Sequence, residues 1–306
     1  MRKLTIIIFL STLLSCNISC GQAKNSENLK ESPPKKNISN SIISQETPKK
    51  LTAIVARIAK INEVQYEHIG LAGTASENYK NFKHLEEIAT TDELVELTNN
   101  KNATVACYAS WALADKSYSN LKSIFDKFLL QDRQVQTFNA CEQSQDNISS
   151  ELYHRYWNNI EDRQKTTDKI LIQLDSSILL SKNPHWLLLT RALENRIYQE
   201  PLKKQISFLA FEQGRIEAIF YLCNWHKAEY AARIKFALVQ YLKKTDFKKT
   251  GTTEYYKTID ELFKFRDPDV RKVIIDKMKK DRHWEMDKER FKYLLADNYI
   301  YNIDNE

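Results

Sequence analysis

Apolar residues recur with helical spacing through most of the chain beyond residue 50. One stripe follows the spacing i, i+3, i+4, i+7, i+8 at Val105, Tyr108, Ala109, Ala112 and Leu113. Two more contain Leu121, Ile124, Phe125, Phe128 and Leu129, and Leu51, Ile54, Val55, Ile58, Ile61 and Val64. A repeat near 3.6 residues is typical of amphipathic helices. Only four glycines and three prolines follow residue 50, too few for the turns of a β-rich body. The pattern therefore predicts an all-α fold.

Several helix boundaries are marked by capping residues. Thr90 followed by Glu93 is typical of a capping box, in which each side chain binds the other residue's backbone N–H. Asn183-Pro184 and Asp267-Pro268 place proline at a first helical position, where its missing N–H is not needed. Gly251 is expected to close one helix directly before Thr252 opens the next.

The predicted helices are connected by short links, which favours packed pairs. We expect pairs at 92–99 with 104–115, 119–130 with 132–142, 150–161 with 166–180, 184–199 with 201–213, 216–224 with 227–243, and 253–264 with 269–280, and a last helix near 285–296. The period of roughly 30–45 residues is typical of helical-repeat solenoids.

Two of the predicted inter-helix turns resemble a known repeat. The segment Glu261–Arg271, with Asp267-Pro268-Asp-Val-Arg271, resembles the turn between the helices of a HEAT repeat, and 101–109 resembles it with Ala106 in place of the arginine. A weaker copy repeats the apolar spacing at Tyr230, Ile234, Ala237 and Leu238. The resemblance implies a HEAT-like α-solenoid of stacked helix pairs, with Asp267 and Arg271 hydrogen-bonding along the stack. An irregular helical bundle stays open as the alternative, because amphipathic pairs can imitate this degenerate motif.

The first residues have the features of an export signal. Arg2 and Lys3 precede an apolar run, Leu4–Leu14, that is too short to cross a bilayer, which needs roughly 20 residues. The following Ser15-Cys16 makes the segment resemble a bacterial lipoprotein signal, in which the leader is cut on the N-terminal side of a cysteine whose sulfur is acylated. Cys20 is the alternative lipidation site, although Asn17 stands where that family pattern has an aliphatic residue.

The expected domain organisation is a signal peptide at 1–15, a disordered tether at 16–50 and a helical repeat domain at 51–306. The tether contains Pro33, Pro34 and Pro48 and many serines and asparagines, so it has too little apolar surface to offset the entropy of ordering. The net charge of the chain is +6, but most of it lies in the signal and the tether, which leaves about +1 for the body. The charge therefore does not indicate a nucleic-acid partner.

The sequence contains no familiar catalytic motif. Its few glycines form neither a P-loop nor a dinucleotide fingerprint, and it has no Gly-x-Ser-x-Gly elbow. No two of its six histidines lie within five residues, so a His-Glu-x-x-His zinc helix is also missing. The segment with His283, Glu285 and Asp287 could contribute to a hydrolase site, but carboxylates there also suit a helix N-terminus. We therefore expect no enzyme activity, cofactor or metal.

The segment 153–157 combines residue types that often anchor protein partners. Tyr153, His154, Arg155 and Trp157 are the candidate interface residues. Tyr153, Tyr156, Trp157 and Ile160 also form a helical stripe, which favours burial in the core, with His154 and Arg155 pointing outward.

Three cysteines, Cys107, Cys141 and Cys223, follow the predicted leader. Each lies in a stretch expected to be apolar and helical, where a free cysteine packs as a small apolar residue. A disulfide between Cys107 and Cys141 is the alternative in an exported protein.

Together these features predict an envelope-anchored lipoprotein that acts as a helical-repeat protein-binding module. The expected partners are a protein and, through the acyl anchor, a lipid membrane. Because acidic residues do not directly follow Cys16 or Cys20, we expect an outer-membrane lipoprotein that faces the periplasm. Two alternatives stay open, a periplasmic immunity or inhibitor protein and an envelope hydrolase.

Overall fold

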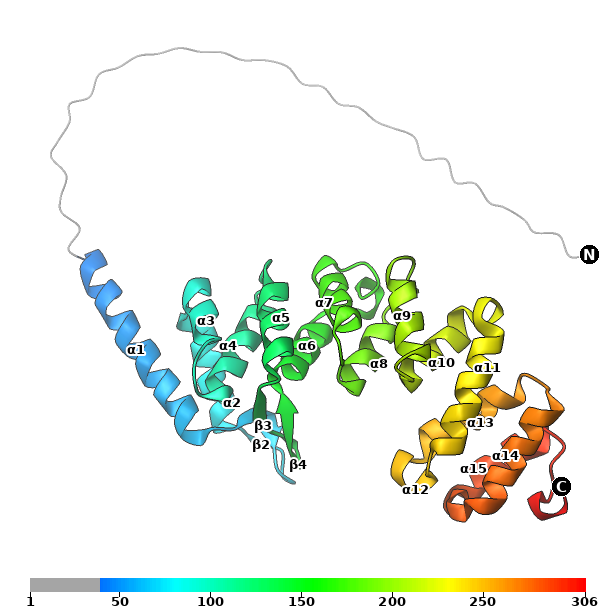
Figure 1. Ribbon diagram of the computed structural model, residues 1–306. Helices are drawn as coiled ribbons and strands as arrows, with labels where there is room; N and C mark the ends of the chain where they lie inside the picture. The colour runs from blue at the N-terminus through cyan, green and yellow to red at the C-terminus, as the bar shows by residue number, and fades with distance from the viewer. Residues whose placement is uncertain (1–38) are drawn as a thin grey trace, which may run out of the picture. The chain divides into compact units, whose positions relative to one another are not determined.

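The computed structural model describes residues 39–306, with side chains from residue 49 onward except that of Lys249 (Figure 1). The predicted signal peptide, the lipidation sites Cys16 and Cys20 and the tether up to residue 38 lie outside the described residues. Residues 45–306 form one compact unit. Within the described residues no helix is long and apolar enough to cross a membrane.

The structure is mostly helical, as predicted, but it is not all-α, because it contains a small sheet. The helices are α1 (Ser39–Ile61), α2 (Glu77–Ile88), α3 (Thr91–Leu97), α4 (Ala103–Asp115), α5 (Leu121–Gln131), α6 (Ile148–Asn159), α7 (Lys169–Leu180), α8 (Trp186–Glu194), α9 (Leu202–Phe211), α10 (Ile216–Trp225), α11 (Lys227–Lys244), α12 (Phe247–Thr250), α13 (Thr252–Phe263), α14 (Pro268–Lys280) and α15 (Lys288–Asp297). The described residues also contain the 3₁₀ turns η1 (Asp162–Gln164), η2 (Arg282–Asp287) and η3 (Ile303–Asn305). The strands are β1 (Val64–Ile69), β2 (Thr74–Ala75), β3 (Gln134–Ala140) and β4 (Glu142–Asn147).

The hairpin of β3 and β4 replaces the helix predicted at 132–142. Asp132 has a left-handed backbone (φ 47°) and ends α5, so the helical period stops there. Buried Val135 and Thr137 then alternate with exposed glutamines, which is the period of two that a half-buried strand requires. Ala140, with φ 48°, lies at the turn into β4. This alternation covers only a few residues, whereas the helical pattern on both sides is longer, so the sequence pattern predicted a helix here.

The stripe that predicted a helix through Val64 also ends earlier than expected. Asn62 has φ 56° and stops α1, and Val64 becomes the first, buried residue of β1. β1 pairs in parallel with β3, where Val64 faces Thr137, and antiparallel with β2. The four-stranded mixed sheet therefore has the order β2-β1-β3-β4.

The first helix also starts earlier than the predicted domain. Residues 39–50, which we expected to belong to the disordered tether, form the first half of α1. The described part of the tether is thus helical.

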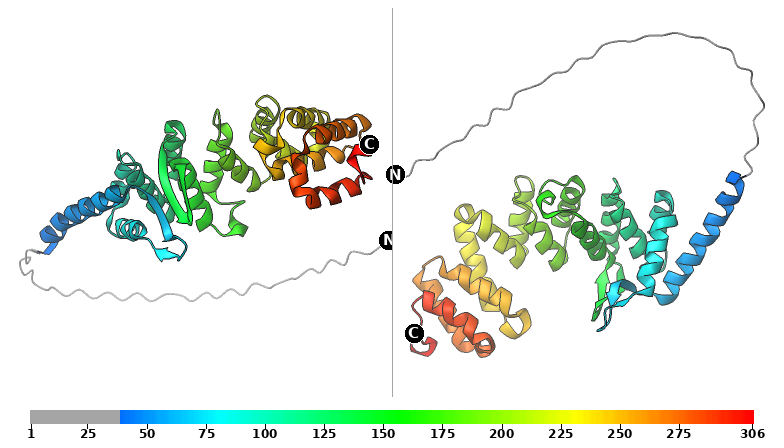
Figure 2. Two further views of the ribbon diagram at one scale, coloured as in Figure 1. Left: turned by 90° about the horizontal axis from the view of Figure 1, so that it is seen from below. Right: turned by 180° about the vertical axis from the view of Figure 1, so that it is seen from behind.

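Polar side chains of the helices hold β1 in place. The Tyr108 hydroxyl of α4 accepts from the Gln65 N–H and donates to the Gln65 carbonyl, each at 2.8 Å. The Tyr66 hydroxyl donates to the Glu151 carboxylate at 2.9 Å, and Trp111 Nε1 donates to the Glu151 carbonyl at 3.2 Å. The sheet accordingly lies against α4 and α6 (Figure 2).

Most predicted helix boundaries are confirmed. Thr90 and Glu93 form the capping box, and Asp267 caps α14 with Pro268 at its first position. Gly251 has φ 83° and separates α12 from α13. The helix expected to begin at Pro184 starts two residues later, at Trp186.

The helices pack in two alternating rows. In one row α4 contacts α6, α6 contacts α8 and α8 contacts α10; in the other α5, α7, α9, α11 and α13 follow one another. Most consecutive helices also pack together across the rows. The expected pair at 184–199 and 201–213 is an exception, because α8 packs on α6, α7 and α10 and α9 packs on α7, α10 and α11.

The buried apolar side chains form two clusters, one drawn from residues 54 to 192 and one from residues 179 to 303. Helices α7 and α8 contribute to both: Ile178 and Leu188 belong to the first cluster, and Leu179 and Leu189 to the second. Adjacent residues on the same two helices therefore connect the two cores.

Glu151 should make the stability of the protein depend on pH. Its side chain is buried, and burial raises its pKa to about 7, although the hydrogen bond from Tyr66 lowers it. The unfolded chain has the ordinary value of 4.5, so the folded state binds more protons between these pKa values and loses stability as pH rises through them. We expect Glu151→Gln to remove this loss, changing the stability difference from wild type by up to ~3 kcal/mol between acidic and mildly alkaline pH.

Urea denaturation across this pH range measures the effect. Glu142→Gln, at an exposed position of β4, is the control and should follow the wild-type profile. Identical profiles for Glu151→Gln and wild type would show that Glu151 is not buried as the structure has it.

Candidate functional site

Helix α11 is flanked by two hollows in the surface. The first, which we call the apolar hollow, has a volume of about 910 Å³ and lies between the end of α9 and one face of α11. Its apolar lining includes Phe211, Ile219, Phe236, Ala237 and Tyr241. Phe236 is 67% exposed. At the edge of the hollow, the Arg233 guanidinium lies 4.2 Å from the centre of the Phe211 ring and 3.0 Å from the Glu212 carboxylate. These contacts connect α11 to the end of α9.

The second hollow, which we call the basic hollow, has a volume of about 950 Å³ and lies where the C-terminal ends of α11 and α14 meet η2. Five cationic side chains line it: Lys243, Lys244, Lys277, Lys280 and Arg282. Lysines are favoured in the last turn of a helix because they face the negative end of its dipole. Lys244, Thr245 and Asp246 line both hollows, so the two adjoin at the end of α11.

The carboxylates that line the basic hollow form hydrogen bonds or ion pairs with other groups of the protein. Asp246 accepts the Lys248 N–H at 3.0 Å, and Glu285 pairs with Arg282 at 2.5 Å. One Asp281 oxygen accepts from the Phe247 N–H at 3.0 Å, and the other contacts the His283 N–H and Nδ1. Burial raises the pKa of Asp281, but the hydrogen bonds from Phe247 and His283 outweigh it and hold the pKa below its usual value.

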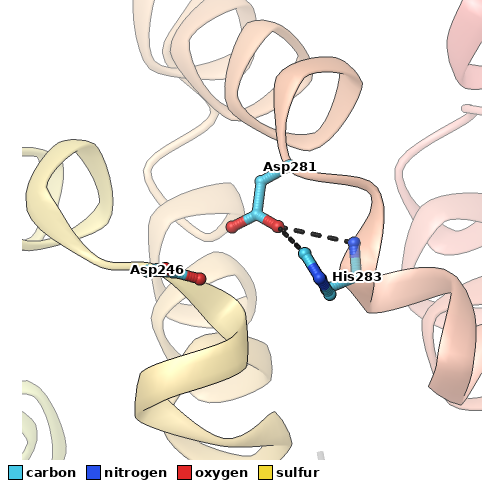
Figure 3. Close-up of side chains that lie close together, drawn as sticks. All are labelled: Asp246, Asp281 and His283. Carbon is cyan, nitrogen blue, oxygen red and sulfur yellow. Dashed lines mark hydrogen bonds and ion pairs between the residues drawn. The ribbon is translucent and has the colours of Figure 1, made fainter.

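Asp246, Asp281 and His283 are also the described residues that could together hold a metal ion (Figure 3). One ligand atom from each lies within 4.8 Å of the others. Lys277 lies 3.7 Å from the Asp281 carboxylate and also donates to the Thr245 carbonyl. Its ammonium group opposes a second cation beside Asp281. We therefore interpret the cluster as a brace in which Asp281 connects the start of α12 to η2.

The structure does not assemble His283, Glu285 and Asp287 into one site. Glu285 pairs with Arg282, and Asp287 lies 4.0 Å from Arg290. His283 meets Asp281 instead. His283 and Glu285 nevertheless both line the basic hollow, whereas Asp287 does not, and the hydrolase alternative stays a prediction.

The candidate interface residues Tyr153 and Trp157 belong to an internal network. The Tyr153 hydroxyl donates to Asp175 at 2.6 Å, and Trp157 Nε1 donates to Asn195 at 2.9 Å. Asn195 donates in turn to the Tyr153 hydroxyl and to Asp175, which also pairs with Arg196 at 2.6 Å. Burial raises the pKa of Asp175 to about 6 against these partners. The network connects α6, α7 and the segment after α8.

Arg155 is also held internally, which corrects the expectation that it points outward. Its guanidinium binds both oxygens of Asp115, at 2.7 and 2.6 Å, and lies 5.3 and 5.1 Å from the ring centres of Phe82 and Trp111. His154 is half-buried, and burial lowers its pKa. The segment therefore joins helices within the protein.

Asp267 and Arg271 both contact neighbouring elements. Asp267 accepts the N–H groups of Asp269 and Val270, and its other oxygen lies 2.7 Å from Lys235 Nζ of α11. Arg271 donates to the Asn298 carbonyl at 2.6 Å and to the Glu306 carboxylate at 2.8 Å.

The three described cysteines are free. Cys107 and Cys223 are buried in helices, as the first interpretation expects, and burial raises the pKa of the Cys223 thiol to about 12. Cys141 is exposed between β3 and β4, so for this residue the expectation of an apolar helical stretch was wrong.

Sequence reasoning identified neither hollow. The available signals were the paired lysines that end two predicted helices, Lys243-Lys244 and Lys279-Lys280, and Phe236, which lies between the buried positions Ile234 and Leu238. No family model, curated protein or solved structure matches the chain.

We expect Asp281→Ala to lower the free energy of unfolding by about 1–2 kcal/mol without any metal present, because the Phe247 N–H and the start of η2 lose their acceptor. Asp276→Ala, an exposed change on the same helix, should be close to neutral. Thermal unfolding in EDTA and in excess Zn²⁺ measures both. A Zn²⁺-dependent stabilisation of wild type that Asp281→Ala abolishes would replace the brace with a metal site.

Proposed function

We propose that the chain is an envelope lipoprotein whose residues 51–306 act as a helical-repeat module that binds a protein partner. The observation that carries the proposal is the pair of adjoining hollows beside α11, in which an exposed Phe236 lies next to a cluster of lysines. Exposed aromatic residues in a hollow are typical anchoring points for protein partners.

The finer fold in this proposal is a HEAT-like α-solenoid. The alternating rows support it, because close packing among α4 to α14 joins helices at most three places apart in the chain. An irregular bundle would also pack helices that are distant in sequence. Asp267 reaches back to Lys235 on α11 and Arg271 reaches forward to Asn298, so both contact neighbouring elements as the repeat resemblance implies.

The proposed anchor rests on the sequence alone. The basic start, the apolar run Leu4–Leu14 and Cys16 resemble a lipoprotein signal. In the proposed arrangement the acylated cysteine holds the protein on the outer membrane, with the helical module in the periplasm.

The anchor proposal predicts that Cys16→Ser moves the protein into the soluble fraction and abolishes its labelling by radioactive palmitate in a Gram-negative host. Cys20→Ser, the matched change, should stay labelled and membrane-bound. Labelling lost with Cys20→Ser instead would assign the acyl group to Cys20. If the double variant is still labelled and retained by the membrane, the protein is not a lipoprotein.

Site-specific photo-crosslinking in the envelope tests the binding function. We expect a photoreactive residue at Phe236 to give a discrete higher-mass adduct with a protein. The same residue at Leu130, an apolar position of α5 that is 87% exposed, is the control and should give none. If Phe236 gives no more protein adduct than Leu130, the protein-binding function is wrong.

A further inference from the structure

We propose that the apolar and basic hollows form one groove for an acidic segment of the partner protein, an inference that rests on the proposed protein-binding function. A bulky apolar side chain of the segment lies beside Phe236, and its carboxylates lie among Lys243, Lys244 and Lys280.

The two hollows are placed to bind one segment. Both are lined by Lys244, Thr245 and Asp246 at the end of α11. The lining face of α11 begins at Ala232, and at 1.5 Å per residue it reaches Lys244 after ~18 Å. An extended chain covers this length with about six residues at ~3.3 Å each. The groove therefore matches a short linear segment.

The apolar hollow offers a site for a large side chain. Ile234, Leu238 and Leu242 are buried in the core, whereas Phe236 lies on a different face of α11 and is two-thirds exposed. The small side chains of Ala232 and Ala237 line the same hollow and let a ligand approach the helix closely. Covering Phe236 removes apolar surface from water, which favours binding.

The charge of the basic hollow indicates that the bound segment is acidic. The side chains of Lys243, Lys244 and Lys280 make no hydrogen bond or ion pair with any described residue, whereas those of Asp246, Asp281 and Glu285 are bonded to backbone N–H groups or to Arg282. Lysines commonly end helices, but here the ends of α11 and α14 bring theirs into one hollow. Cations gathered at one open hollow of the surface attract an anionic ligand, so an acidic segment fits and a basic one does not.

Binding of peptide arrays to the full chain tests the inference, with Cys16→Ser and Cys20→Ser introduced to keep it in solution. One array places Leu, Phe or Trp at varied spacing before several Asp or Glu residues. The matched array has Lys or Arg in place of the acids. We expect the protein to bind acidic members, with affinity that falls as salt increases.

Two sets of variants locate the binding. The triple change of Lys243, Lys244 and Lys280 to Gln, and separately Phe236→Ser, should each weaken binding of the acidic peptide about tenfold or more. The controls are Lys116, Lys169 and Lys272 changed together to Gln, and Leu130→Ser, all at exposed positions. They should change affinity less than twofold, and circular dichroism checks that every variant is folded.

Three results would overturn the inference: equal binding of the basic array, no binding of any acidic member, or binding that the groove variants do not weaken.

Co-sedimentation with phosphatidylcholine vesicles, with and without phosphatidylglycerol, tests a lipid surface. Lysine-dependent vesicle binding without peptide binding would assign the hollow to anionic lipid. If Phe236 still crosslinks to a protein in the triple lysine variant, protein binding stands and only the acidic segment is excluded.

Discussion

Each short helix of this protein keeps its apolar stripe out of water only by lying against the helices before and after it. Helices of about 12 residues or fewer are marginal alone, so their stability comes from packing. In α4, for example, every residue from Thr104 to Ala114 is buried. This requirement explains why α4, α6, α8 and α10 follow one another in one row and α5, α7, α9 and α11 in the other. It also explains why α7 and α8 serve both cores.

The same requirement makes buried polar groups important at the junctions. Once packing has excluded water, a polar side chain needs a partner inside the protein. Tyr108 satisfies both backbone groups of Gln65, and the network around Asp175 connects α6, α7 and Asn195. These bonds fix which residues face one another, whereas the apolar contacts supply most of the stability. The raised pKa values of Glu151 and Asp175 follow from the same burial.

The candidate groove arises from the way helices end. Lysines suit the C-terminal turns of α11 and α14 for local electrostatic reasons. Packing then brings the two ends together around Asp281, which bonds to the Phe247 N–H and leaves Lys243, Lys244 and Lys280 facing the hollow. A feature that stabilises each helix separately becomes a concentrated positive surface through their arrangement. Phe236 is exposed beside it because α11 turns its other face to the core.

Features that depend only on neighbouring residues could be predicted from the amino-acid sequence. The helical stripes, the capping box of Thr90 and Glu93, the start of α14 at Pro268 and the break at Gly251 are all local, so spacing and capping chemistry predict them. Features that depend on residues far apart in the chain became visible only in the folded structure. Residues 134–140 form a strand because β3 pairs with β1, with Thr137 opposite Val64. The few alternating residues in this segment do not by themselves predict a pairing with a strand so far away in the sequence. Arg155 is internal because Asp115, Phe82 and Trp111 meet it, and the groove exists because two helix ends converge.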